Sequence, residues 1–268
     1  MPAIIIIPAR YESTRFPGKP LYPLKGIPII QHVYNNSRRA RLADDVIVAT
    51  DSETIFERVF AFGGKAVMTD KKHPSGTDRI AEVAASMDYD IVVNVQADEP
   101  LVRPEMIDAV INVLNDKRAS IGTLAKKIED PREIIDPNVV KVVFDREGFA
   151  IYFSRAPIPF YRDLFSLKYG SAEAQKQGRE EATFRPLDFQ TSELFMFKHI
   201  GIYSYRRDVL VALSSMEPTK LEQIEKLEQL RALENGMKIK IEETFFETYG
   251  VDTPEDLERM EKCLSTSL

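Results

Sequence analysis

The chain has little of the residues on which disulfide and zinc sites depend. Of its 268 residues, one is cysteine and three are histidine. The single thiol, Cys263, excludes an intramolecular disulfide framework and a zinc site built on cysteine. His32, His73 and His199 lie far apart in the sequence, which disfavours a histidine-rich metal site.

Long hydrophobic runs are also missing. Residues 3–7 are apolar, but this run stops at Pro8 and Arg10, and no basic segment precedes it. It is too short for a signal-peptide core or a membrane-spanning helix. We therefore expect a cytoplasmic protein that does not enter a membrane, and the lone thiol agrees with that.

The chain also lacks an excess of basic residues. The formal net charge is −6, whereas a general nucleic-acid binder normally carries a basic surface, so no nucleic-acid partner is expected. A phosphate-binding pocket remains compatible, because a local cluster of cations can oppose the net charge. Hydrophobic residues make up 44% of the chain, enough for a sizeable core, and the length suits one large α/β domain or two small ones.

The first half alternates buried strands with amphipathic helices. Residues 4–7, 45–50 and 90–95 are apolar, β-branched runs of the kind found in parallel strands covered on both faces. Ser52 is placed to cap a helix that stops at Gly63-Gly64, and Pro104 to start another. This alternation predicts an α/β fold with a doubly wound, mostly parallel sheet.

The second half has a different texture. Residues 139–154 predict a β-hairpin and 199–205 a strand, while 165–195 is polar and weakly periodic, as in a surface insertion, a mobile flap or an oligomer contact. The capping-box pair Thr219 and Glu222 predicts one helix that runs to Gly236. No linker divides the chain, so we expect a single domain over 1–268, with 139–205 as a sheet extension.

The loop after the first strand is the strongest candidate site. It carries Arg10, Arg15, Gly18 and Lys19 where ligands bind in open α/β sheets. Arginine grips phosphate oxygens in pairs and lysine adds a compact charge, so a polyphosphate is the natural ligand. A solvated basic loop is the alternative. The pattern is not a Walker A motif, and no GxGxxG follows a strand.

Acidic residues follow the neighbouring strands. Asp51 and Asp98 should lie near the basic loop, and a carboxylate that faces a triphosphate normally holds Mg²⁺. An acidic surface turn is the alternative for Asp98, and a helix N-terminal acid is the favoured local interpretation of Asp252. Residues 75–79 fit either close approach to a ligand or ordinary helix capping. His199 by itself fits a structural histidine. Glu228 and Gln229 fit the solvent-exposed face of a helix.

Collinear motifs give the chain a family resemblance. The N-terminal IPARYxSTRFPGKPL resembles the CTP-binding signature of the 3-deoxy-manno-octulosonate cytidylyltransferase (CMP-Kdo synthetase) family. Further matches follow in order and cover nearly the whole chain except 165–195: VATD, SGTDR, VNVQADEP, YFSRAPIP, HIGIY, LEQLRALENG and GVDTPEDL.

The resemblance implies that CTP and the acidic sugar Kdo give CMP-Kdo and diphosphate, for lipopolysaccharide synthesis. It implies a nucleotide-diphospho-sugar transferase-like mixed sheet, with a smaller β-containing extension used for dimerisation, and a homodimer with Mg²⁺. The family pattern assigns Lys19, Asp98 and Asp252 to catalysis, with both aspartates as metal ligands. It places at the nucleotide Ala9, Arg10, Arg15, Lys19, Ser75, Arg79 and Gln96. It places at the sugar Gln96, Arg155, His199, Tyr203, Glu228 and Gln229.

Two departures from the family pattern concern the site. Ala97 stands where the family commonly has glycine, and alanine disfavours a positive φ. The segment 165–195 is longer than usual, which leaves an 8-amino-Kdo analogue open as the substrate. A different acidic sugar and a catalytically inactive nucleotide-binding regulator also remain open as interpretations of the chain.

Overall fold

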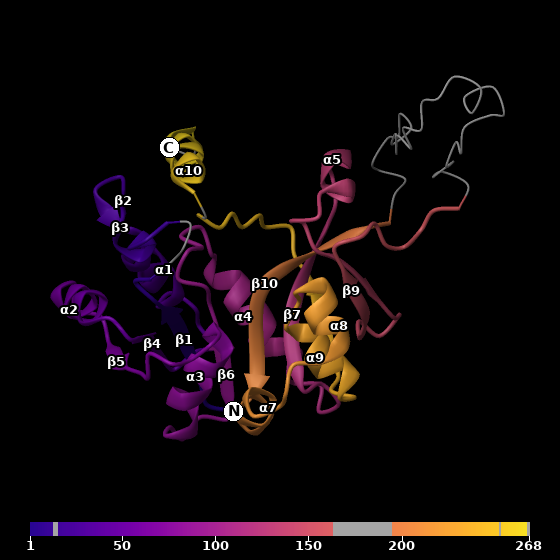
Figure 1. Cartoon of the computed structure of the whole chain (residues 1–268), viewed down its shortest axis with the longest axis horizontal. Coiled ribbons are helices and arrows are strands. Elements are labelled where there is room, and N and C mark those ends of the chain that lie inside the picture. Colours follow the sequence, from indigo (N-terminus) through magenta and orange to yellow (C-terminus); the bar gives the residue numbers. More distant parts are fainter. Residues whose placement is uncertain (13–15, 163–194, 252, 267–268) are drawn as a thin grey trace.

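One mixed β-sheet organises the molecule (Figure 1). The computed structural model describes residues 1–12, 16–162, 195–251 and 253–266. Within them the sheet has nine strands, seven of them in the order β11-β7-β10-β6-β1-β4-β5, with β8 and β9 attached beside β10. The mixed α/β sheet predicted from the sequence is confirmed.

The three expected buried strands and one short, partly exposed strand, β5, form the parallel half of the sheet. These are β1 (Ala3–Ala9), β4 (Asp45–Thr50), β5 (Ala66–Met68) and β6 (Ile91–Asn94). β10 (Phe197–Arg206) runs antiparallel to both β6 and β7 (Ile121–Lys127), and β11 (Ile239–Glu243) is parallel to β7. The sheet is therefore parallel where the basic loop leaves β1 and mixed beyond β6.

The segment 139–205 divides between the sheet and an outgrowth. The predicted hairpin is present as β8 (Lys141–Phe144) and β9 (Ala150–Ser154), which extend the sheet. Only the first residues of β10 pair with β8, and the rest of β10 lies between β6 and β7 in the main sheet. Nearly all of 165–195 lies outside the described residues.

Helices cover both faces of the sheet. Along the chain follow α1 (Ile29–Ser37), α2 (Glu53–Ala61), α3 (Gly76–Ala85), α4 (Pro104–Val113), α5 (Pro131–Ile135), α7 (Arg207–Ser214), α8 (Lys220–Glu225), α9 (Gln229–Glu234) and α10 (Pro254–Thr266). Short elements near the basic loop are η1 (Lys19–Leu21), β2 (Pro23–Leu24) and β3 (Ile27–Pro28). None of the helices described is both long and apolar enough to cross a membrane.

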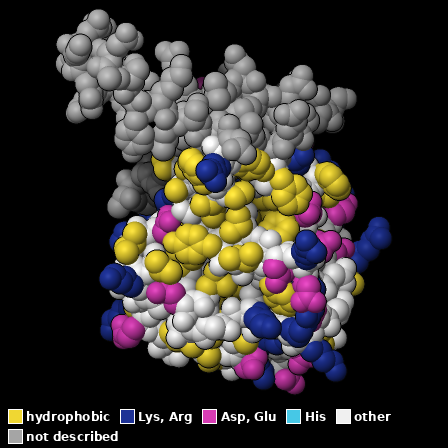
Figure 2. Space-filling model, turned by 90° about the vertical axis from the view of Figure 1, so that its right-hand side faces the viewer, with side chains coloured by type: hydrophobic (Ala, Val, Ile, Leu, Met, Phe, Trp, Pro, Cys, Tyr) yellow, Lys and Arg dark blue, Asp and Glu magenta, His cyan; other side chains and the backbone are white. Residues whose placement is uncertain are grey.

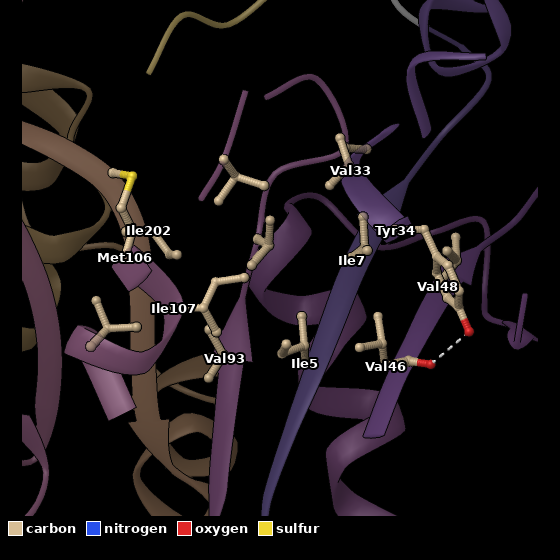
Figure 3. Packing of buried hydrophobic residues seen from close by; sticks show 14 of the residues in the cluster. Ile5, Ile7, Val33, Tyr34, Val46, Val48, Val93, Met106, Ile107 and Ile202 are labelled. Carbon is tan, nitrogen blue, oxygen red and sulfur yellow. Dashed lines mark hydrogen bonds between the residues drawn. The ribbon is translucent and has the colours of Figure 1, made fainter. Parts of the chain in front are cut away.

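Two hydrophobic clusters hold the layers together, one on each face. Successive side chains of β1 point to opposite faces, so Ile5 and Ile7 join one cluster while Ile4 and Ile6 join the other. Figure 3 shows Ile5 and Ile7 among side chains from α1, β4, β6 and α4. Each such buried side chain contributes about 1.5–3 kcal/mol, which makes β1 a rigid support for the loop that follows it.

Most predicted helix boundaries are confirmed, and one predicted helix is wrong. Ser52 accepts from the Ile55 N–H at 3.4 Å, and Pro104 is the first residue of α4. The single helix expected up to Gly236 is instead α8 and α9, because Lys226 adopts a left-handed conformation with φ 55°. The break turns the chain, so that α9 starts in a new direction.

Candidate active site

A cavity of about 270 Å³ opens at the carboxyl ends of β1 and β6 and at the start of α3. The crevice rule for open α/β sheets predicts a ligand site there. All the predicted nucleotide and metal residues that the structure describes line it: Ala9, Arg10, Lys19, Ser75, Arg79, Gln96 and Asp98. Arg15 and Asp252 lie outside the described residues.

The basic loop folds so that its lysine meets the acid that follows β6. Gly18 has φ 71°, a left-handed conformation that glycine adopts without strain, and it immediately precedes η1. Its N–H donates to the Tyr11 carbonyl at 2.8 Å, which closes the loop. Lys19 Nζ then lies 2.5 Å from Asp98 Oδ2, with the two side chains 12% and 28% exposed. A cation and a carboxylate thus stand together on the cavity wall.

Arg79 is held from behind the cavity. Its side chain is 4% exposed, and its Nη2 lies 2.6 Å from Asp51 Oδ2 at the end of β4. Its Nη1 donates to Thr69 Oγ1. Asp51 therefore does not line the cavity itself, and it acts there by fixing the guanidinium of Arg79.

Residues 75–79 are both a helix cap and a cavity wall. Ser75 Oγ accepts from the Asp78 N–H at 3.1 Å, so the capping interpretation is confirmed. Gly76 packs so closely on β1 that a Cβ there would lie 3.2 Å from Pro8 Cγ. The start of α3 therefore borders the cavity, and a helix N-terminus favours anions such as phosphate.

Asp98 is suited to a hard cation. Its carboxylate faces the cavity, and the Val251 N–H donates to its backbone carbonyl at 2.9 Å. The residue after Val251 is Asp252, so the backbone leading to the second predicted ligand is fixed beside the first. In the part of the chain that the structure describes, no three His, Cys, Asp or Glu side chains are grouped so that they could hold a metal ion. Mg²⁺ requires no such group, since it binds through one or two carboxylates, waters and substrate phosphates.

His199 and Tyr203 lie together on β10, next to the β6 end of the site. Their rings are 5.2 Å apart, and Tyr203 pairs with Asn94, whose Oδ1 accepts from Gln96 Nε2 at 3.4 Å. The Thr123 hydroxyl donates to the Ile202 carbonyl and so accepts from His199 Nε2–H at 2.9 Å. This assigns the Nδ1 atom of His199 as an acceptor.

The remaining sugar candidates come from the α8–α9 region. Glu228 contacts Ser75 on the cavity wall, with Ser75 Oγ 3.2 Å from its Oε1. Gln229 is buried at the start of α9. Arg155 lies elsewhere: its Nε donates to the Glu225 carbonyl at 2.7 Å and its Nη1 to the Pro137 carbonyl at 2.7 Å. Of the predicted sugar residues, Gln96 alone lines the cavity; the others, Arg155, His199, Tyr203, Glu228 and Gln229, do not.

One expectation about the cavity wall is corrected, and one residue of the wall was not predicted. Ala97 is buried there without a positive φ, so the backbone concern raised by its methyl group does not apply. His73 also lines the cavity and hydrogen-bonds to Glu82. Its place two residues before the predicted Ser75 was a usable signal, although a single histidine in a loop does not stand out by itself.

The chain is similar to known proteins over nearly its whole length. The family model described as Cytidylyltransferase matches residues 4–239. The chain is 49% identical to a 3-deoxy-manno-octulosonate cytidylyltransferase from Thermodesulfovibrio yellowstonii, over 99% of both chains. It is 51% identical to the enzyme of that name from Geobacter metallireducens, over 97% of this chain and 96% of the relative.

A solved structure of CMP:2-keto-3-deoxy-manno-octonic acid synthetase complexed with CTP has a TM-score of 0.86 to this fold. It is 38% identical in sequence and is matched over 100% of both chains. A basic loop, a capped helix start and an acid thus meet at one cavity in a chain that is about half identical to two relatives of one named activity. The chain belongs to the cytidylyltransferases and, among these nucleotidyltransferases, to the 3-deoxy-manno-octulosonate cytidylyltransferase family.

Proposed function

We propose that the cavity binds CTP and Kdo and that the chain converts them into CMP-Kdo and diphosphate. The Lys19–Asp98 pair on the cavity wall carries this proposal, because it supplies a cation and a metal-binding carboxylate at one point. The CTP complex of the structural relative, matched over the whole chain, supports it. The proposed product serves lipopolysaccharide synthesis in the cytoplasm.

The reaction requires one anion to approach another. The anomeric hydroxyl oxygen of Kdo loses its proton to solvent and attacks the α-phosphorus of CTP, the bond from that phosphorus to the β-phosphate oxygen breaks, and diphosphate leaves. Arg10, Arg15 and Lys19 hold the triphosphate and neutralise the charge that develops on the leaving oxygen. Ala9, Ser75, Arg79 and Gln96 hold the nucleoside against the end of β1. No side chain of the protein is needed as a nucleophile.

Asp98 and Asp252 would hold Mg²⁺. The bound ion supplies positive charge that lowers the pKa of an alcohol and offsets the charges of the phosphates and the sugar carboxylate. Lys19, which is already paired with Asp98, keeps that carboxylate oriented toward the cavity. The arrangement of the two substrates in line depends on these fixed side chains.

We place the sugar at Gln96, which lines the cavity, and toward His199, Tyr203, Glu228 and Gln229, which lie outside its lining. Burial lowers the pKa of His199 to about 3, so this ring is neutral and offers a hydrogen-bond acceptor rather than a charge. Arg155 would act on the sugar side only indirectly, because it donates to the Glu225 and Lys226 carbonyls in the turn that precedes Glu228. An 8-amino-Kdo analogue or another acidic sugar would use the same chemistry.

Replacement of Asp98 tests the proposal. Asp98→Asn removes the charge but keeps the shape, so we expect a folded protein whose diphosphate release from CTP and Kdo falls roughly 100- to 1,000-fold. Asp130→Asn, at an exposed helix cap, is the control and should retain full turnover. Unchanged diphosphate release by a folded Asp98→Asn protein would sink the assignment.

Two further measurements separate the candidate functions. A panel of acidic sugars, run with CTP in the presence and absence of Mg²⁺, identifies the acceptor and tests the metal. Binding of CTP without turnover of any sugar would instead support an inactive nucleotide-binding regulator.

We also propose a homodimer through the face formed by β9 and α8. Figure 2 shows hydrophobic side chains gathered on this side of the molecule. Ile151 on β9 is 62% exposed and Ile224 on α8 is 67% exposed. Among the described strands β9 pairs with β8 alone, so its other edge offers unpaired backbone groups. A second copy of the chain, which carries the same apolar face, fits such a surface.

A further inference from the structure

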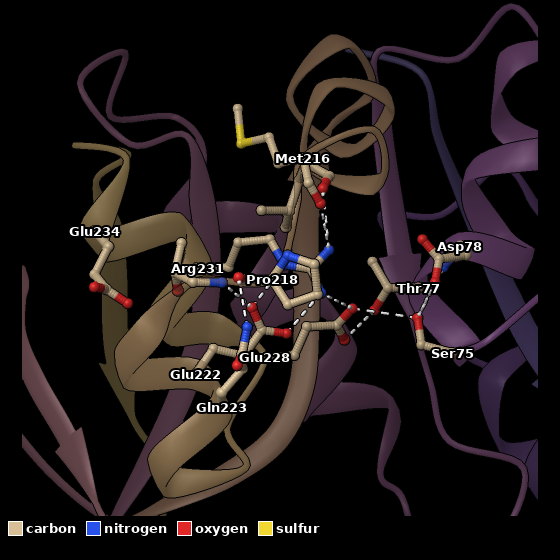
Figure 4. A network of polar contacts seen from close by, with 12 residues as sticks. Ser75, Thr77, Asp78, Met216, Pro218, Glu222, Gln223, Glu228, Arg231 and Glu234 are labelled. Carbon is tan, nitrogen blue, oxygen red and sulfur yellow. Dashed lines mark hydrogen bonds and ion pairs between the residues drawn. The ribbon is translucent and has the colours of Figure 1, made fainter.

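A buried ion pair lies beside the cavity without lining it. Glu222 on α8 and Arg231 on α9 are 11% and 9% exposed (Figure 4). Arg231 Nε donates to Glu222 Oε2 at 2.8 Å and Nη2 donates to Oε1 at 2.6 Å. Nη1 lies 3.4 Å from the Leu213 carbonyl and 3.3 Å from the Met216 carbonyl. The guanidinium is therefore fixed from several sides.

Stability alone is a weak reason for such a pair. Removal of two charges from water costs free energy that their mutual attraction only partly offsets, and apolar side chains often replace buried pairs without loss. The pair also joins α8 to α9 across the break at Lys226. What it fixes is the direction in which α9 starts.

The direction of α9 determines the position of the Glu228 side chain, because Glu228 immediately precedes this helix. Its Oε2 accepts from Thr77 Oγ1 at 2.7 Å, and its Oε1 lies 3.2 Å from Ser75 Oγ (Figure 4). Burial raises the pKa of Glu228, while the Thr77 hydrogen bond and the charge of Arg231 lower it. Arg231 Nη2 lies 4.0 Å from Glu228 Oε1, close enough for that charge to act.

We propose that Arg231, clamped by Glu222, is a positioning residue that holds the Glu228 carboxylate against Ser75 and Thr77 and so shapes the sugar side of the cavity. The inference rests on the proposed function in one respect, namely that Glu228 contacts the sugar. It adds two residues that do not line the cavity themselves. Loss of the clamp should weaken binding of the sugar more than binding of CTP, because the triphosphate residues lie on β1, β6 and the loop after β1.

Glu222→Gln and Arg231→Lys test the clamp. Glu222→Gln keeps the shape of the side chain but removes the negative charge. Arg231→Lys keeps the positive charge but loses the paired N–H donors that bind both carboxylate oxygens. We expect KM for Kdo to rise roughly tenfold in each variant, as for the loss of one charge-assisted hydrogen bond, while KM for CTP and kcat change by less than about twofold. Arg206→Lys is the matched control, since Arg206 also donates to backbone carbonyls, of Ala119 and Leu114, away from the cavity.

The outcomes separate this inference from the proposed function. If folded clamp variants match Arg206→Lys in all three constants and lose only thermal stability, the pair is structural and the inference is wrong. Glu228→Gln is measured beside them. If it leaves KM for Kdo unchanged, the sugar role of Glu228 fails instead. A raised KM for Kdo in Glu228→Gln, with both clamp variants normal, rejects the clamp alone.

Discussion

His199 shows how one buried side chain limits what the site can do. Burial lowers its pKa to about 3, against 6.5 for an ordinary histidine. Thr123 fixes the ring through its Nε2 atom, and the ring of Phe153 packs on it edge-on with the ring centroids 5.1 Å apart. A neutral ring in this setting can accept a hydrogen bond from a sugar hydroxyl, but it cannot neutralise a sugar carboxylate. In the proposed complex, the cations of the cavity wall would have to do so.

The same burial makes stability depend on pH. Below pH 6.5 the unfolded chain takes up a proton that folded His199 refuses until about pH 3, so folding stability falls as the pH falls through this window. Between pH 7.5 and 5.0 this one group costs at most about 2 kcal/mol. His199→Gln removes the titration, so the variant should lose about 1–2 kcal/mol less than the wild type over this range.

Urea unfolding at pH 7.5 and pH 5.0 measures this difference. His32 and His73 are present in both proteins, so their contributions cancel in the comparison. Equal losses of stability in wild type and His199→Gln would show that the ring is accessible to protons in the folded protein.

At the scale of helices and strands, features that depend on neighbouring residues could be predicted from the sequence, and features that depend on distant residues could not. Ser52 and Ser75 have the side chains that cap a helix, and both do so. Lys226 carries no signal for a helix break, because the leucine spacing continues across it and glycine is the usual left-handed residue. The contacts between Glu228, Ser75 and Thr77 join residues about 150 positions apart, and no local pattern encodes them.

The break at Lys226 gives a prediction about the helix pair. A non-glycine residue in the left-handed region costs about 1–2 kcal/mol, whereas glycine adopts it freely but loses more chain entropy on folding. Lys226→Gly should therefore raise the free energy of unfolding by about 0.5 kcal/mol. Lys226→Ala keeps the backbone strain and should not raise the free energy of unfolding. The urea midpoint of Lys226→Gly should therefore be higher than that of Lys226→Ala. A stabilised alanine variant would mean that α8 and α9 join in solution.

The candidate site was more predictable on its nucleotide side than on its sugar side. Arg10, Lys19, Gln96 and Asp98 all follow strand ends, and parallel strands bring their carboxyl ends to one edge. Apart from Gln96, the sugar candidates lie on β10, next to β9 or at the start of α9, whose positions depend on the antiparallel insertion of β10 between β6 and β7. Only the family resemblance named them, and their absence from the cavity lining shows that a motif match does not place a side chain in a cavity.

For the whole molecule, the net charge does not describe how the charged side chains are arranged. The net charge of −6 gives no indication of the cavity, where Arg10, Lys19 and Arg79 gather. Many acids are used in pairs, as in Asp98 with Lys19 and Asp51 with Arg79. Cations therefore gather at one cavity of an acidic protein, although two of them are paired with carboxylates.

The apolar face of β9 and α8 makes the last prediction one about assembly. A stable interface buries about 800 Å² on each partner with an apolar centre, and Ile151 lies on β9, which among the described strands pairs with β8 alone. We expect the wild type to have the mass of two chains in light scattering at micromolar concentration, and Ile151→Asp to have the mass of one. The control is Phe60→Asp, on α2 at the other side of the molecule, where a 73% exposed side chain should be replaced without effect on mass (Figure 1). A wild-type protein of single-chain mass, or an Ile151→Asp protein that remains paired, would mean that this face is not where two copies meet.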